Sequence, residues 1–164
     1  MPDGPGRPVL TLLEEPSLAA TDSPSARGKS LTAGETPGAP RPIAGLDGPA
    51  FRDLLQAGLV WLDRHHEIVN ALNVFPVPDG DTGTNMLLTM KSACQEIETD
   101  SMSNVADVAK AAAHGALMGA RGNSGVILSQ ILRGIARRLD GEVWLTGPLF
   151  AAALSEGSRI AYKG

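Results

Sequence analysis

The sequence predicts an all-α fold for the part of the chain that follows a Pro- and Gly-rich tail. Apolar residues recur at three- and four-residue spacing in successive segments, which is the period of an amphipathic helix. No segment alternates apolar and polar residues for long enough to predict a strand. Aromatic residues make up only 4% of the chain, so the core is expected to be aliphatic, which suits closely packed helices.

Residues 1–45 form the tail, which is predicted to be disordered. Residues 46–164 are predicted to form a folded domain. The tail is rich in Pro, Gly, Ser, Thr and Ala, and it cannot bury enough apolar surface to offset the entropy cost of ordering. Its Gly28-Lys29-Ser30 resembles the end of a phosphate-binding P-loop. Ser23 stands where that motif needs a glycine, so the motif fails.

Five helices are expected in the folded part, and their starts are predicted from residues that cap helices or favour a first turn. The predicted starts are Asp47 followed by Pro49, then Thr82 or Thr84, then Ser103 or Asn104, then Ser124, and finally Thr146 with Pro148. The third helix is expected to run to about Met118, the fourth to stop at Gly141 and the fifth to run into Tyr162.

Composition excludes several classes of function. The formal net charge of −4 lacks the basic excess that a nucleic-acid partner requires. The single cysteine, Cys94, excludes an internal disulfide and is expected to be a buried, inert thiol. No apolar run approaches the roughly 18 to 20 residues of a membrane span, and the N-terminus lacks a signal-peptide pattern. We therefore expect a cytoplasmic protein without an integral membrane segment.

The first loop of chemical interest is NVFPVPDGDTGTN, residues 73–85. Asp79 and Asp81 bracket Gly80, and a glycine permits the sharp turn that brings two carboxylates onto one ion. Oxygen ligands suit Mg²⁺ or Ca²⁺. A calcium-binding EF-hand that starts at Asp79 would need Gly at its sixth position and Glu at its twelfth, and it has neither. Mg²⁺ fits better, because it takes further ligands from phosphates.

Two predicted helix starts add anion-binding groups to this loop. Free amides and the positive end of the helix dipole attract anions at such starts. Either loop alone is typical of an ordinary turn, but together they indicate a site for a metal and a nucleoside triphosphate. The candidate residues are Thr82, Thr84 and Asn85 after the acids, and Arg121, Asn123, Ser124 and Gly125 in GARGNSG, residues 119–125.

The segments VPDGDTGTNM (77–86) and GALMGARGNSGVILSQ (115–130) resemble the DhaL, or Dak-phosphatase-type, nucleotide-binding domain. The amino-acid sequence of these segments is most similar to that of the ATP-binding subunit of bacterial fatty acid kinase. The ADP-binding subunit of dihydroxyacetone kinase has the same fold class. The resemblance covers roughly residues 48–164 and implies an antiparallel helical barrel that binds Mg·ATP at one end. Related chains continue into further helices, so a truncated C-terminus and an exposed apolar face are expected.

The resemblance also implies roles for individual residues. Asp79 and Asp81 match the catalytic, magnesium-binding acids, and Asn73 is the nearest match to a third ligand. The segment of Asn123, Ser124 and Gly125 matches the part that meets the phosphates, as does the helix start at Thr84 and Asn85.

The leading functional hypothesis is an ATP-dependent kinase domain that phosphorylates a fatty acid presented by a DegV-type fatty-acid-binding protein. A fatty acid carboxylate is already ionised at pH 7, so its phosphorylation needs no general base. One alternative is a dihydroxyacetone-kinase-like subunit that acts on a small hydroxyl compound. Another is a non-catalytic nucleotide- or metal-binding fragment. Any homo-oligomer is expected to form through domains that this chain lacks.

Overall fold

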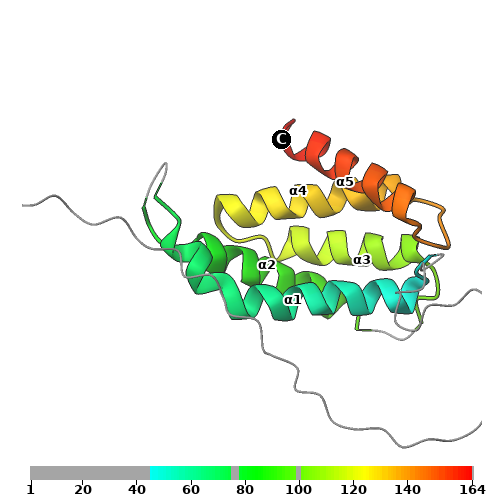
Figure 1. The fold of residues 1–164 in the computed structure, drawn as a ribbon, viewed down its shortest axis with the longest axis horizontal. Coiled ribbons are helices and arrows are strands. Elements are labelled where there is room, and N and C mark those ends of the chain that lie inside the picture. The colour runs from blue at the N-terminus through cyan, green and yellow to red at the C-terminus, as the bar shows by residue number, and fades with distance from the viewer. Residues whose placement is uncertain (1–44, 75–77, 99–100, 164) are drawn as a thin grey trace, which may run out of the picture. The chain divides into compact units, whose positions relative to one another are not determined.

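The computed structural model describes residues 45–74, 78–98 and 101–163, and the all-α prediction is confirmed for them. Apart from Gly45, the predicted tail lies outside the described residues. No helix in the described part of the chain is long and apolar enough to cross a membrane. The helices are α1 (Gly48–Ala71), α2 (Thr82–Glu96), α3 (Val105–Met118), α4 (Gly122–Arg138) and α5 (Gly147–Ala161) (Figure 1).

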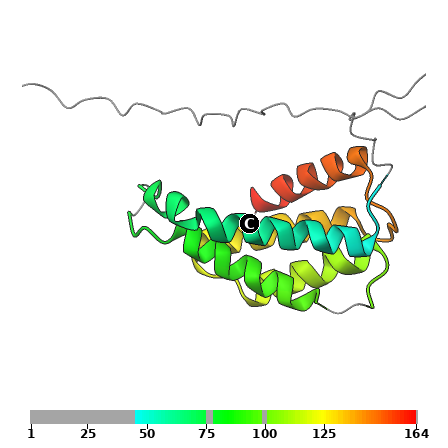
Figure 2. The ribbon, with the colours of Figure 1, turned by 60° about the horizontal axis from the view of Figure 1, so that its bottom comes forward.

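Successive helices run in opposite directions, so α2 and α4 begin at one end of the helical body while α1, α3 and α5 begin at the other (Figure 1). The second helix is central, because it packs against α1, α3 and α4. The fifth lies at an angle at the edge of the body, and its contacts with other described helices are all with α4 (Figure 2). An antiparallel bridge between Leu46 and Leu145 joins the segments that precede α1 and α5.

The core is aliphatic, as predicted from the composition. Cys94 is buried, as predicted, and its burial raises the pKa of the thiol to about 11, with a smaller contribution from the charge of Glu98. The largest fully buried side chains are Ile97, Leu139, Val105, Val108, Thr89 and Ser129.

Three helix starts follow the predicted local capping chemistry. Asp47 accepts a hydrogen bond from the amide of Ala50 at 2.9 Å, and Asn104 accepts one from that of Asp107 at 2.8 Å. Thr146 accepts one from the amide of Leu149 at 3.4 Å. Each cap is a polar side chain within three residues of its donor, which is why the sequence alone located it.

The predicted starts of the other two helices were wrong. Neither Thr82 nor Thr84 caps α2, because its N-cap residue is Asp81, and that residue makes no side-chain capping bond. The fourth helix begins at Gly122, not at Ser124. Gly122 has a φ of +54°, a left-handed conformation that suits glycine and turns the chain into the helix two residues early.

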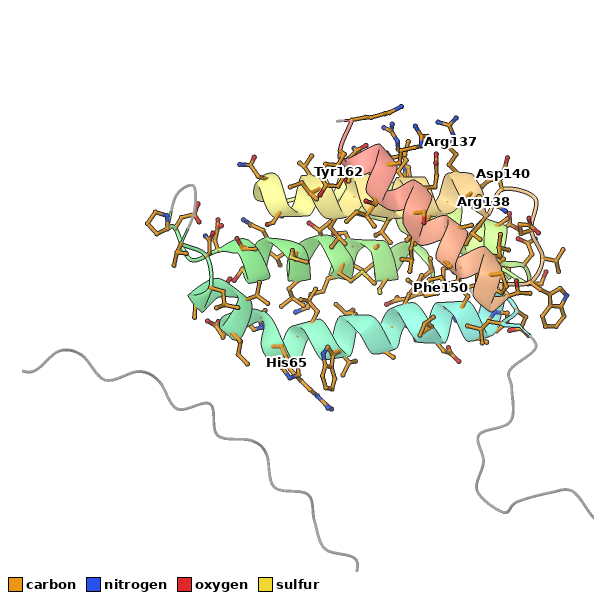
Figure 3. The ribbon with its side chains drawn as sticks, turned by 45° about the horizontal axis from the view of Figure 1, so that its top comes forward. His65, Arg137, Arg138, Asp140, Phe150 and Tyr162 are labelled. Atoms are coloured by element: carbon orange, nitrogen blue, oxygen red, sulfur yellow. The ribbon has the colours of Figure 1, made fainter. Side chains whose placement is uncertain are left out.

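The far end of α4 carries a group of exposed charges (Figure 3). Arg137 pairs with Glu156 at 3.7 Å and Arg138 with Glu142 at 3.6 Å. Both arginines lie in the last turn of α4, where cations offset the helix dipole, as expected for a solvated helix end. Exposed pairs of this kind contribute little to stability.

A partly exposed apolar groove lies beside α5. This groove of about 490 Å³ lies between α4 and α5 and is open to solvent. Ile127 and Leu154 on its walls are 52% and 45% exposed. The lining residues are Ile127, Ile131, Leu154, Ser158, Ala161 and Tyr162.

We predict opposite effects from adding a methyl group at two helical glycines. A Cβ on Gly134 would lie 2.5 Å from the Cα of Gly157, whereas a Cβ on Gly58 would meet nothing within 4 Å. Gly134→Ala should therefore separate α4 from α5 and lower the free energy of unfolding by about 1–3 kcal/mol. Gly58→Ala should raise it by about 0.5–1 kcal/mol, because alanine loses less backbone entropy on folding. Urea denaturation measures both, and a stabilising Gly134→Ala would contradict the packing argument.

Candidate functional site

The two loops singled out from the sequence meet in the structure. The hydroxyl of Ser124 donates to the carbonyl oxygen of Thr82 at 3.2 Å. Gly122 lies against Asn85, since a Cβ on this glycine would be 2.3 Å from the Asn85 amide nitrogen. The first turns of α2 and α4 are therefore side by side, and residues about 40 positions apart form one candidate site.

The acidic loop brings the side chains of Asn73 and Asp79 into contact, and Asp81 follows two residues after Asp79. Gly80 has a φ of +65°, so a glycine is required between the two acids. The amide nitrogen of Asn73 donates to the carboxylate of Asp79, and both Asp79 and Asp81 are exposed. Residues 75–77 of this loop lie outside the described residues.

The donor chemistry of this loop fits a hard cation. In the described part of the chain, no group of three or more His, Cys, Asp or Glu side chains is placed to hold a metal. The candidate set is therefore the two carboxylates of Asp79 and Asp81 with the amide oxygen of Asn73. Such an oxygen-only set, with few protein ligands, suits Mg²⁺, which keeps several waters and binds phosphates.

The start of α2 is capped from α1, by Asn70. The Oδ1 atom of Asn70 accepts from the amide of Thr84 at 3.1 Å, and its Nδ2 atom donates to the Thr84 hydroxyl at 2.9 Å. Asp81 occupies the N-cap position but makes no capping bond, and its carboxylate has no hydrogen bond or ion pair with another described residue. Asn70 therefore performs the capping that Asp81 ordinarily would.

Close packing between α1 and α2 makes this cap reachable. A Cβ on Gly83 would lie 2.1 Å from the carbonyl oxygen of His66, so only glycine lets the first turn of α2 rest on the α1 backbone. The sequence did not reveal the role of Asn70. Its partner lies 14 positions away, and a polar residue near a helix end is too common to mark a cap.

A second residue that was not predicted, Thr89, connects the two loops through its buried side chain. Its hydroxyl is fully buried, donates to the carbonyl oxygen of Asn85 at 2.8 Å and accepts from the amide of Arg121 at 3.1 Å. Gly125 packs on the same hydroxyl, because a Cβ there would lie 2.3 Å from Thr89 Oγ1. Gly125 is thus required by the contact between α2 and α4.

The remaining predicted residues lie at or near the surface, at the starts of α2 and α4. Arg121 and Asn123 are exposed, and Thr82, Thr84, Asn85 and Ser124 are half-buried. The first hydrogen bond of α4 runs from the amide of Gly125 to the carbonyl oxygen of Arg121 at 2.9 Å, and α4 has no side-chain cap. The amides that precede Gly125 are therefore not used within the helix, which makes them suitable partners for an anion.

The chain is therefore a helical domain in which an externally capped helix start, an uncapped helix start and an acidic loop lie at the same end. Comparison with known proteins agrees with this class. The family model of the DAK2 domain matches residues 76–164, and the chain belongs to the DAK2 domain family. This family is related to the dihydroxyacetone kinases, and its members generally bind nucleotide.

Similar proteins occur in Bacillus subtilis and Staphylococcus aureus. Protein YloV of Bacillus subtilis (strain 168) is 48% identical over 121 residues. Uncharacterized proteins of Staphylococcus aureus strains USA300 and NCTC 8325 are each 44% identical over the same length. The match covers 74% of this chain but 22% of each relative, so the chain spans about a fifth of the length of these proteins.

We predict that Thr89→Val destabilises the domain although it preserves the side-chain shape. The change leaves the Arg121 amide without its acceptor, which should lower the free energy of unfolding by about 1–3 kcal/mol. Ser155→Ala is the matched control, because Ser155 bonds only within the exposed surface of α5. Urea denaturation of both variants provides the measurement, and equal midpoints would show that Thr89 does not hold the loops together.

Proposed function

We propose that the chain is an ATP-dependent phosphotransferase domain that holds Mg²⁺ and ATP between the loops 73–85 and 119–125. The observation that carries this proposal is the state of Asp81. It stands at the N-cap of α2, yet Asn70 takes over the capping and leaves the Asp81 carboxylate without a partner among the described residues. A carboxylate kept available beside two helix N-termini supports a metal that in turn holds phosphates.

In this proposal, the acidic loop would bind the metal ion and the start of α4 would bind the phosphates. Asp79, Asp81 and Asn73 would hold the metal, and bound Mg²⁺ would neutralise charge on the phosphates. The amides at the start of α4, with the Ser124 hydroxyl, would receive phosphate oxygens. Phosphoryl transfer depends mainly on such positioning and charge neutralisation.

We further propose that the acceptor is a fatty acid carboxylate presented by a DegV-type binding protein. The histidine nearest the start of α2 supports an acceptor that needs no base. Nδ1 of His66 is 2.7 Å from the carbonyl oxygen of Asp63, and Nε2 is 3.1 Å from the Glu67 carboxylate. Both ring nitrogens thus face α1, not the site. A carboxylate acceptor is already ionised at pH 7.

The second candidate is a subunit that phosphorylates a small hydroxyl compound, as the kinship with dihydroxyacetone kinases suggests. A hydroxyl acceptor calls for a general base within hydrogen-bond reach. The orientation of the His66 ring disfavours this residue in that role. A non-catalytic nucleotide-binding role is the third candidate, and it differs from both in giving no transfer.

We predict that Asp81→Asn weakens Mg·ATP binding by at least about tenfold, because it removes a charged metal ligand of the proposed site. The thermal midpoint should be unchanged, since Asp81 makes no capping bond. Asp53→Asn removes the same charge from an exposed position on α1 and should bind normally. Calorimetric titration with and without EDTA separates the effects, because the loss should vanish when Mg²⁺ is absent. Unchanged affinity of Asp81→Asn in Mg²⁺ would remove the metal assignment.

The chemical class of the acceptor can be determined from the reactivity of the phosphorylated product with hydroxylamine. Radiolabelled γ-phosphate from ATP should be transferred when the chain is mixed with a fatty-acid-loaded DegV-type protein. An acyl phosphate reacts with hydroxylamine to give a hydroxamate, whereas a phosphate ester does not. Hydroxamate formation is expected. A hydroxylamine-stable product formed from dihydroxyacetone would favour the second candidate, and absence of any transfer despite bound ATP would favour the third.

A further inference from the structure

The amide of Asn70 has one orientation that its neighbours permit. The backbone N–H of Thr84 can only donate, so the atom that faces it at 3.1 Å must be the oxygen of Asn70. The NH₂ group then faces the Thr84 hydroxyl at 2.9 Å and the Glu67 carboxylate at 3.5 Å. The carboxylate can only accept, so it and the Thr84 N–H require the same orientation, and the Thr84 hydroxyl then accepts from the NH₂ group.

This orientation fixes the role of the Thr84 hydroxyl. Its oxygen accepts from Asn70, so its own hydrogen must be directed elsewhere. Thr89, Ser92 and Ser155 donate their hydroxyl hydrogens to carbonyl oxygens four residues back in their helices. Thr84 makes no such bond, and its hydrogen has no acceptor among the described residues.

We propose that Asn70 is a positioning residue that makes the Thr84 hydroxyl a dedicated hydrogen-bond donor to an anionic oxygen of the ligand bound at the start of α2. The inference rests on the proposed function, in which that oxygen belongs to a nucleotide phosphate. A hydroxyl can both donate and accept, and one that has been committed to donation recognises an anion without rearrangement. The same side chain caps α2, so one residue secures the helix and sets the polarity of the site.

The test is Asn70→Asp, which keeps the shape and the cap but reverses the second hydrogen bond. A carboxylate oxygen still accepts from the Thr84 amide and keeps the cap, while the new charge lies beside the exposed Glu67 carboxylate and should lower the thermal midpoint only slightly. The other carboxylate oxygen replaces an NH₂ donor with an acceptor, and the Thr84 hydroxyl must then donate to it. We expect Mg·ATP binding to weaken roughly 10- to 150-fold, as for the loss of a hydrogen bond to a charged oxygen.

Two further variants separate the hydroxyl from the added charge. Ala71→Asp places the same charge on the next residue, at an exposed position at the end of α1, and should weaken binding much less. Thr84→Val removes the hydroxyl, and in that background Asn70→Asp should cost no more than Ala71→Asp does. Calorimetric titration with Mg·ATP and a thermal melt are measured for every variant.

Each outcome decides between the two proposals. If the wild-type chain binds Mg·ATP and Asn70→Asp binds no worse than Ala71→Asp, the donor assignment is overturned and the proposed function stands. A lower thermal midpoint with unchanged affinity would give Asn70 a purely structural role and would overturn the assignment as well. If the wild-type chain does not bind Mg·ATP, the proposed function and the donor assignment are both wrong.

Discussion

The arrangement of the candidate site depends on the close contact between the end of α1 and the first turn of α2. Gly83 lies directly on the backbone of His66, and the side chain of Asn70 reaches across to Thr84. A larger residue at position 83 would force the two helices apart and carry the acidic loop with α2. The position of Asp81 relative to α1 is therefore set by a packing constraint between backbones, which is stiffer than any contact among the exposed loop side chains.

A second close contact extends this constraint to α4. The buried Thr89 hydroxyl accepts a hydrogen bond from the backbone amide of Arg121. The absence of a side chain on Gly125 lets α4 approach α2. The first contact joins α2 to α1 and the second joins α2 to α4, so this helix relates α1, the acidic loop and the glycine-rich loop to one another. A site that positions phosphates benefits from such rigidity, because donors that are already in place need no reorganisation when charge develops.

The features that could be predicted from the sequence are those that depend on residues close together in the chain. Helical periodicity and local caps at Asp47, Asn104 and Thr146 gave the helices that begin far from the site. The starts of α2 and α4 were misplaced, because one is capped from a different helix and the other begins through a left-handed glycine. The chemical character of both loops could be read from their residues, but their contact could not. Asn70 and Thr89 were missed for the same reason, since their partners are distant in the chain. The ligand roles of Asp79, Asp81 and Ser124 remain predictions.

The distribution of helix caps gives these observations a common explanation. The three helices that begin away from the site carry a side-chain cap from their own N-cap residue, whereas α2 and α4 carry none (Figure 1). A missing cap costs about 0.5–2 kcal/mol, and Asn70 offsets this at only one of the two starts. A capping bond from the side chain at position 81 or 121 would stabilise its helix start, but it would occupy the amides and the carboxylate of the proposed metal–phosphate site. The chain thus forgoes local stability where α2 and α4 begin, and an anion bound between these two helix ends would restore it through the same unpaired amides.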